Sequence, residues 1–205
     1  MMREEIVRAF PLDSILGEEE GRSGPEGRRT WVLDPIDGTK NFVDGVQLWA
    51  TIVALLVDGD PVVGVVRAPA LDEHYEAALG GGASLNGEPI HVSTVDRVTE
   101  SLILHSGIED WLDTPYWRGF RELVRSARRT RDYCDFWGQM LVARGSAQAM
   151  LEVDPGWPWD WAAPMLIVRE AGGEMSTFDG DVPAGGCRVL STNGALHAEI
   201  LGACA

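Results

Sequence analysis

The stretch TWVLDPIDGTKNF, residues 30–42, joins an apolar strand to a sharp turn that carries two carboxylates. Pro35 keeps Asp34 out of the helical region of backbone space, and Gly38 permits a tight turn directly after Asp37. The two aspartates are therefore expected side by side at the end of a strand. Since adjacent carboxylates bind hard cations, this turn is a candidate metal site.

A helix is expected to begin at Thr39, directly after this turn. The start of this helix is a candidate phosphate site. Exposed N–H groups at the start of a helix bind phosphate well. The alternative is that Asp34 and Asp37 are ordinary turn and capping residues, because two aspartates at this spacing are common in turns. The stretch alone leaves both interpretations open.

Two more acidic positions could join the same site. Glu18 lies upstream in the run GEEE, residues 17–20, and Asp160 lies in WDWAA, residues 159–163, where a helix opens. Taken singly, each has a simpler explanation, with Glu18 in a solvated loop and Asp160 as a helix N-cap. The order of these motifs along the chain gives the combination more weight than its parts.

Composition and charge narrow the class of protein. The chain has 205 residues, of which 45% are hydrophobic, enough for one large domain or two small ones. Its net charge of −15 argues against nucleic acid and anionic membranes as partners. The three cysteines have no metal-ligand spacing, and their odd number disfavours a disulfide scaffold, so a cytoplasmic location is expected. No apolar run reaches the length of a membrane span.

The pattern of apolar residues predicts a mixed α+β fold. Residues 48–57 and 62–68 predict a β-hairpin in a buried sheet, and residues 75–78 and 83–87 predict another. The elements expected further on are a strand at 101–107, a helix at 115–129, a strand at 132–135, helices at 136–147 and 162–171, a strand at 187–191 and a helix near 195–203. This irregular mixture favours layered α+β over a strictly alternating parallel sheet.

A soft boundary is expected near residue 105. Residues 1–105 would then hold the metal and phosphate groups, and residues 106–205 would complete the site. Residues 2–10 predict an amphipathic helix with Met2, Ile6 and Phe10 on one stripe. Because the stripe starts without a cap, the helix is expected to have lost its beginning. The following residues, 11–29, are turn-rich.

The motifs resemble the signature sequences of the inositol-monophosphatase family. They are GEE at residues 17–19, WVLDPIDGTKNF at 31–42 and WDWAAPMLIVREAGG at 159–173. The resemblance extends over nearly the whole chain. It implies a layered α-β-α-β-α sandwich with the site between its two halves, and a homodimer. It also implies a Mg²⁺-dependent hydrolase of phosphate monoesters, with a small-molecule phosphate ester as substrate.

The resemblance implies a metal role for five residues. Glu18, Asp34 and the carbonyl oxygen of Ile36 would hold one ion, and Asp34, Asp37 and Asp160 would hold a second. Two or three ions are implied in all. Oxygen ligands without histidine or cysteine select Mg²⁺ or Mn²⁺ over zinc, which agrees with this assignment. No covalent phospho-enzyme is needed.

The substrate would lie between two groups of residues. By resemblance, Gly38 and Thr39 contact the phosphate and the attacking water, next to Asp160. Inositol-specific members carry Gly-Ser-Ala where this chain has DYCDFW, residues 132–137, and the difference resembles the histidinol-phosphatase branch. Asp135 and Glu152 could then bind the ammonium and imidazole groups of histidinol phosphate.

Alternatives stay open for these residues and for the function. Asp135 could instead cap helix 136–147, and sugar-phosphate enzymes of the family also carry an acidic residue near Glu152. The expected function is histidinol-phosphate phosphatase in histidine biosynthesis. One alternative is an inositol-1-phosphate, sugar or nucleotide monophosphatase. Another is a truncated, poorly catalytic metal-binding member, because relatives begin with about two more helices that supply an acidic residue and a lysine near the water.

Overall fold

The computed structural model describes residues 2–133 and 135–204 of the chain. Its α-helices are α1 (Met2–Ala9), α2 (Thr39–Val43), α3 (Ile108–Trp111), α4 (Trp117–Ser126), α5 (Asp135–Ala143), α6 (Pro158–Glu170) and α7 (His197–Cys204). Its strands are β1 (Ser14–Gly17), β2 (Gly21–Ser23), β3 (Arg29–Asp37), β4 (Ala50–Val57), β5 (Asp60–Ala68), β6 (Glu73–Ala78), β7 (Gly82–Leu85), β8 (Glu88–Pro89), β9 (Leu102–His105), β10 (Arg129–Asp132), β11 (Ala149–Gly156), β12 (Glu174–Thr177) and β13 (Cys187–Thr192). Short 3₁₀ helices occur at Pro69–Leu71 and Val98–Glu100. Within the described ranges, no helix is long and apolar enough to cross a membrane.

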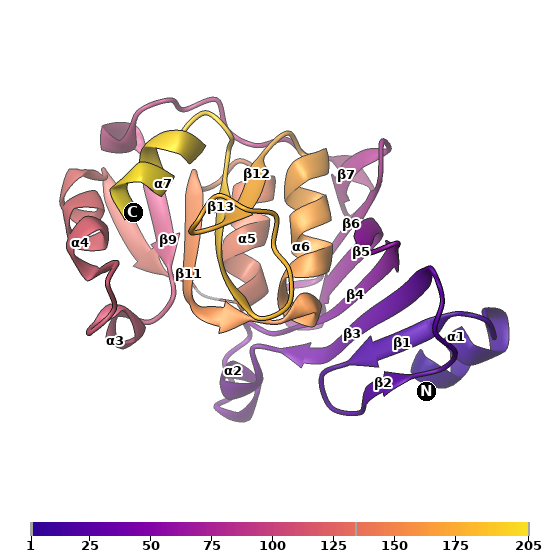
Figure 1. Ribbon diagram of the computed structural model, residues 1–205. Helices are drawn as coiled ribbons and strands as arrows, with labels where there is room; N and C mark the ends of the chain where they lie inside the picture. Colours follow the sequence, from indigo (N-terminus) through magenta and orange to yellow (C-terminus); the bar gives the residue numbers. More distant parts are fainter. Residues whose placement is uncertain (1, 134, 205) are drawn as a thin grey trace.

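The elements stack as alternating layers in the order α-β-α-β-α, which confirms the expected layered α+β fold (Figure 1). Helix α1 lies on the outer side of the first sheet. Helices α5 and α6 lie between the two sheets, and α3, α4 and α7 cover the outer side of the second sheet. Each sheet thus buries apolar side chains on both faces.

The first sheet has eight strands in the order β2-β1-β3-β4-β5-β6-β7-β8. The two predicted hairpins are confirmed as the antiparallel pairs β4–β5 and β6–β7. Strands β1 and β2 were not predicted, because their few residues lie among glycines and charges in the turn-rich segment 11–29. They exist through pairing, since β1 runs parallel to β3 and carries β2 as its antiparallel neighbour.

The second sheet has five strands in the order β10-β9-β11-β13-β12. The predicted strands at 101–107 and 187–191 are confirmed as β9 and β13. The prediction of a strand at 132–135 is wrong, because β10 ends at Asp132 where its parallel register with β9 ends at His105. Cys134 lies outside the described residues.

The predicted helices are confirmed with shifted ends. Helix α6 begins at Pro158 instead of residue 162, because Pro158 is well suited to the first helical turn and Trp157 before it has extended backbone. This helix packs closely on the first sheet. A Cβ atom on Gly64 of β5 would lie 2.9 Å from the carbonyl oxygen of Ala163 in α6. The contact holds α6 against the sheet that carries the DPIDG turn.

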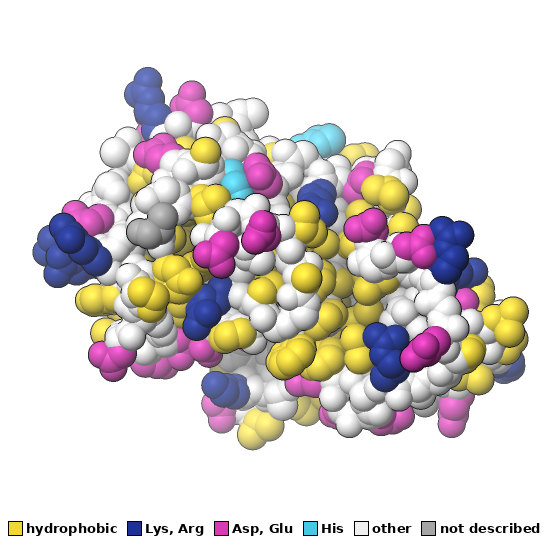
Figure 2. Space-filling view, viewed as in Figure 1, with side chains coloured by type: hydrophobic (Ala, Val, Ile, Leu, Met, Phe, Trp, Pro, Cys, Tyr) yellow, Lys and Arg dark blue, Asp and Glu magenta, His cyan; other side chains and the backbone are white. Residues whose placement is uncertain are grey.

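Helices can cover both faces of a sheet because successive residues of a strand face opposite sides. In β9, Ile103 packs toward α4 and α7, whereas Leu104 packs toward α5. The exposed arginines of α4 form a basic group at the edge of the molecule, where Figure 2 shows dark blue atoms over this helix. On the other side, α1 buries Ile6 against the first sheet, while Phe10 is 38% exposed and its ring lies 5.3 Å from that of Trp31 in a tilted arrangement. The boundary near residue 105 stays a proposal.

Candidate active site

Strand β3 presents Asp34 and Asp37 on one side of the sheet because its pairing with β4 is irregular. Asp34 pairs with Ile52 and Asp37 with Ala50, so β3 uses three residue steps where β4 uses two. On a regular strand, residues three apart face opposite sides of the sheet. The extra residue of the bulge returns Asp37 to the side of Asp34. Both aspartates are buried.

Asp160 joins these two aspartates from the first turn of α6. Carboxylate oxygens of Asp34, Asp37 and Asp160 all lie within 4.8 Å of one another. Asp160 is the third residue of α6, not its N-cap, and its Oδ2 accepts a hydrogen bond of 2.6 Å from the N–H of Trp157. The N-cap alternative for Asp160 is therefore wrong, and the hydrogen bond that its side chain accepts at the helix start coexists with its place in the cluster.

Glu18 borders the cluster from the turn between β1 and β2. Its N–H donates to the carbonyl oxygen of Leu33 at 3.2 Å, which continues the parallel pairing of β1 with β3. Its carboxylate interacts with that of Asp34 and is exposed to solvent. The tight set of carboxylate oxygens does not include Glu18, so the structure places it at the rim of the cluster.

The turn after Asp37 is organised by short contacts. The N–H of Ile36 donates to Oδ1 of Asp34 at 2.9 Å, and its carbonyl oxygen accepts a hydrogen bond of 2.8 Å from Oγ1 of Thr39. Gly38 has φ of +78°, and a Cβ atom there would lie 2.7 Å from the carbonyl oxygen of Leu48. Only glycine fits this position, as the sequence indicated.

The clustered carboxylates hold their protons more tightly than ordinary aspartates. Burial, then the charge of Glu18, raises the pKa of Asp34 to about 8. Burial raises the pKa of Asp160 to about 6, against the hydrogen bond from Trp157. The pKa of Asp37 also lies well above its usual range, through burial and then the charge of Asp135. Burial is therefore the main cause of the raised pKa values, and the neighbouring carboxylates add to it.

A divalent cation fits this set of donors. The hydrogen bonds that oppose the raised pKa values come from the backbone N–H groups of Ile36, Phe136 and Trp157. These bonds do not offset the burial and repulsion that raise the pKa values. The donors are all oxygen atoms, which suits Mg²⁺ or Mn²⁺ better than zinc.

A pocket of about 310 Å³ adjoins the cluster. Residues from both halves of the chain line it: Gly38, Thr39, Lys40 and Asn41 from the first, and Ser106, Gly107, Asp110, Asp135, Glu152 and Asp154 from the second. The structure thus brings the predicted phosphate residues and the predicted substrate residues around one cavity. A Cβ atom on Gly38 would lie 3.5 Å from Oδ2 of Asp135.

Glu152 lies in β11 and lines this pocket. Its carboxylate accepts a hydrogen bond from the backbone N–H of Asp135, and burial, then the charge of Asp135, raises its pKa to about 8. Within the described part of the chain, no group donates to its buried Oε1 atom. A cationic or hydroxyl group of a ligand could satisfy this atom.

Asp135 has a left-handed backbone, with φ of +58°. Residues other than glycine rarely adopt this conformation, but aspartate is among those that tolerate it. The next N–H, that of Phe136, donates to Oδ2 of Asp37 at 2.9 Å. Asp37 therefore receives one of the N–H groups at the start of α5. The capping alternative for Asp135 itself is left open by these contacts.

Asp110 and Asp154 also line the pocket, and the sequence did not single them out. Asp154 follows the apolar residues of β11 in the sequence Asp154-Pro155-Gly156, where pairing with β13 becomes irregular. An Asp-Pro pair near the end of a strand, as at Asp34-Pro35, was the sequence signal that could have identified Asp154. Asp110 follows β9 in a short helix, and nothing in its sequence context separates it from an ordinary surface residue.

Known proteins give an independent comparison. The sequence profile of the inositol monophosphatase family matches residues 1–204. A histidinol-phosphatase of Mycobacterium tuberculosis is 42% identical over 205 residues, covering 98% of this chain and 78% of that protein. A histidinol-phosphatase of Streptomyces coelicolor is 40% identical over 211 residues, covering 98% and 79%.

A solved structure supports the same relationship. The inositol monophosphatase from Anabaena (Nostoc) sp. superposes with a TM-score of 0.89 at 32% sequence identity. The match covers 98% of this chain and 81% of that one. Sequence and fold agree over the same extent of the chain. The chain therefore belongs to the inositol monophosphatase family.

Proposed function

We propose that this protein is a Mg²⁺-dependent phosphatase that hydrolyses histidinol phosphate. The observation that carries the proposal is the arrangement around one pocket. The turn at Gly38 and Thr39 lines this pocket beside the aspartate cluster, and the carboxylates of Asp135 and Glu152 line the same pocket. A substrate that carries both a phosphate and cationic groups is complementary to this arrangement.

The cluster supplies the metal ligands in this proposal. Asp34, Asp37 and Asp160 would hold one ion, and Glu18, Asp34 and the carbonyl oxygen of Ile36 would hold another. Mg²⁺ is the ion we propose, with Mn²⁺ as a substitute. Divalent ions bound there would supply Lewis acidity, which neutralises the charge of the phosphate and promotes ionisation of a water.

The protein groups around the phosphate orient the reactants. Thr39 donates its hydroxyl proton to the carbonyl oxygen of Ile36, which leaves lone pairs of Oγ1 free to accept a hydrogen bond from the attacking water. The left-handed turn at Gly38 exposes backbone N–H groups that could donate to phosphate oxygens. Both roles require the bulge of β3 to keep this turn beside the aspartates.

The leaving group would be recognised by charge. Histidinol carries an ammonium group and a protonatable imidazole, and Asp135 and Glu152 could accept hydrogen bonds from them. A bound cation would lower the pKa of Glu152 from about 8, so this carboxyl would ionise as the substrate binds. The relatives from M. tuberculosis and S. coelicolor are histidinol-phosphatases, which supports the same substrate here.

The wider setting follows from this substrate. A histidinol-phosphate phosphatase acts in histidine biosynthesis, and we propose that role for this protein. A cytoplasmic location and a homodimer are proposed with it. The soft division of the chain near residue 105 would place the metal ligands Glu18, Asp34 and Asp37 in one part and Asp160 in the other.

A panel of phosphate esters tests the proposal. Phosphate release is measured with Mg²⁺ for histidinol phosphate, inositol 1-phosphate, glycerol 2-phosphate and a nucleoside monophosphate. We expect histidinol phosphate to have the highest kcat/KM. A preference for inositol 1-phosphate would assign the protein to the inositol-specific enzymes. Metal binding without turnover of any ester would make it a poorly catalytic member of the family.

A further inference from the structure

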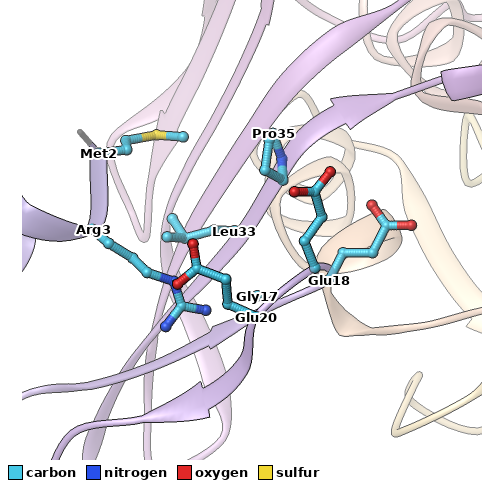
Figure 3. A pocket seen from close by; sticks show the side chains of 8 residues that line it. Met2, Arg3, Gly17, Glu18, Glu20, Leu33 and Pro35 are labelled. Carbon is cyan, nitrogen blue, oxygen red and sulfur yellow. The ribbon is translucent and has the colours of Figure 1, made fainter.

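The guanidinium of Arg3, near the start of α1, lies over the turn that carries Glu18 (Figure 3). Its Nη1 donates to Oγ of Ser23 at 2.6 Å, and its Nη2 donates to the carbonyl oxygen of Gly21 at 2.8 Å. Its Nε lies 3.0 Å from the carboxylate of Glu20. One side chain from a different layer thus contacts three residues of the β1–β2 hairpin.

Gly17 makes room for this arrangement. A Cβ atom on Gly17 would lie 2.7 Å from Nη2 of Arg3, whereas its other near neighbour, the carbonyl oxygen of Leu33, would be at an ordinary 3.7 Å. Gly17 does not have the left-handed backbone that requires glycine. A side chain at residue 17 would therefore have to displace the guanidinium of Arg3, whose side chain is only 18% exposed.

The contact distinguishes between neighbouring carboxylates. Three consecutive glutamates, residues 18–20, occupy the turn, and their mutual repulsion favours no single one of them at the metal site. Arg3 pairs with Glu20, while the carboxylate of Glu18 interacts with Asp34. The ion pair alone would be worth little, because the Glu20 side chain is 70% exposed. The two further hydrogen bonds make the contact a geometric restraint on the hairpin.

We propose that Arg3 is a positioning residue for the metal site. By holding Gly21, Ser23 and Glu20, it sets the conformation of the turn in which Glu18 faces Asp34. Arg3 does not touch the cluster, so it acts through the backbone of the turn. The inference rests on the proposed function to the extent that Glu18 is a metal ligand.

Two variants disturb the contact in different ways. Arg3→Met removes the guanidinium and keeps much of the side chain, and Gly17→Ala leaves Arg3 present but displaces its Nη2 atom. Partners that orient metal ligands typically contribute about 10–100-fold to metal affinity, and we expect the low end, about tenfold, for an indirect contact. The double variant should lose no more than either single one, because both remove the same contact.

The readout is the affinity for Mn²⁺ alone, measured by electron paramagnetic resonance on the full chain. Arg8→Ala is the matched control, because Arg8 lies on the same helix and forms an exposed ion pair with Glu5. Its Mn²⁺ affinity should equal that of the wild type. The melting temperature of each variant, measured in EDTA, separates weaker metal binding from general destabilisation.

The outcomes separate this inference from the proposed function. Weaker Mn²⁺ binding in both single variants, without further loss in the double variant, supports the positioning role. Unchanged Mn²⁺ affinity in Arg3→Met, with a wild type that binds the ion, overturns it and leaves the phosphatase proposal standing. Equal losses in Arg3→Met and Arg8→Ala also overturn it. A wild type that binds no Mn²⁺ overturns the metal site and this inference together.

Discussion

The backbone N–H of Phe136 donates a hydrogen bond of 2.9 Å to Oδ2 of Asp37, across 99 residues of sequence. The start of α5 thus contacts a carboxylate of the proposed metal site. The residue before Phe136 is Asp135, whose charge raises the pKa of Asp37. Metal site and substrate pocket are therefore coupled, and a substitution on one side is expected to be felt on the other.

Asp37→Asn should abolish turnover and leave the fold intact. The amide keeps a carbonyl oxygen that can accept the N–H of Phe136, but it removes a charge from the metal site. Loss of a metal ligand costs several kcal/mol in the transition state, so kcat should fall by at least about a hundredfold. Steady-state kinetics and the melting temperature are the measurements.

The control for this variant is Asp72→Asn. Asp72 is an exposed aspartate with left-handed backbone, paired with Arg67. Its replacement should change neither kcat nor metal dependence.

EDTA should abolish the activity of the wild type, and Mg²⁺ should restore that activity. Full activity in EDTA would contradict the metal-dependent mechanism.

Asp135→Asn should lower activity on histidinol phosphate selectively. Asparagine tolerates the φ of +58° as aspartate does, so the backbone should be kept while the charge is lost. One charge-assisted hydrogen bond is worth about 1.5–3 kcal/mol, or roughly one to two decades in kcat/KM. Activity on glycerol 2-phosphate, whose alcohol part carries no charge, should be spared.

The measurement is the ratio of kcat/KM for the two esters in wild type and variant. Because Asp135 also acts on Asp37, the Mg²⁺ concentration must be saturating for both proteins. Equal losses on both esters would mean that Asp135 acts through Asp37 or as a helix cap. The assignment of histidinol phosphate would then lose its structural support.

Metal-free protein should lose stability as the pH rises. The pKa of Asp160 is raised to about 6 and that of Asp34 to about 8, both above the ordinary value. Between about pH 4 and pH 8 the folded chain therefore binds more protons at these groups than the unfolded chain, and stability falls as they ionise. A divalent cation replaces the protons, so Mg²⁺ should stabilise more at higher pH.

The sign of this pH dependence is checked by thermal unfolding in EDTA and in Mg²⁺, at about pH 6 and about pH 8. The rise in melting temperature on adding Mg²⁺ should be larger at the higher pH. Asp34→Asn removes one titrating group and should flatten the dependence in EDTA. A Mg²⁺ effect that shrinks as the pH rises is the contrary result.

Gly38→Ala should damage both stability and activity. The left-handed backbone disfavours any Cβ atom by about 1–2 kcal/mol, and here the atom would also meet the carbonyl oxygen of Leu48 at 2.7 Å. Gly45→Ala is a close control, because Gly45 has φ of +75° and no atom within 4 Å of the added Cβ.

Urea unfolding and kcat are measured for both glycine variants. Gly45→Ala should show only the backbone penalty and near-normal kcat. Gly38→Ala should lose more stability and most of its activity, because the turn that we propose to bind the phosphate must shift. Equal effects in the two variants would show that the contact with Leu48 is unimportant.

Much of the site was predictable because its determinants are local. Pro35 and Gly38 restrict the backbone by sterics within one or two residues, so the turn at Asp34 and Asp37 follows from the sequence. The first hairpin of this sheet follows equally from continuous apolar runs rich in β-branched residues, joined by a short turn. By contrast, β1 and β2 have few residues of strand character and form only because β3 offers an edge.

The contacts that give the site its chemistry are long-range. The metal-binding character of the motifs was implied by the sequence, but no local preference places Asp160 against Asp34, Asp135 beside Gly38 or Arg3 over the turn at Glu18. These distances arise because α5 and α6 bury apolar side chains between two sheets, while α1 buries Ile6 on the outer face. Burial is non-directional and sums over the whole core, so it sets such distances only once every layer is packed.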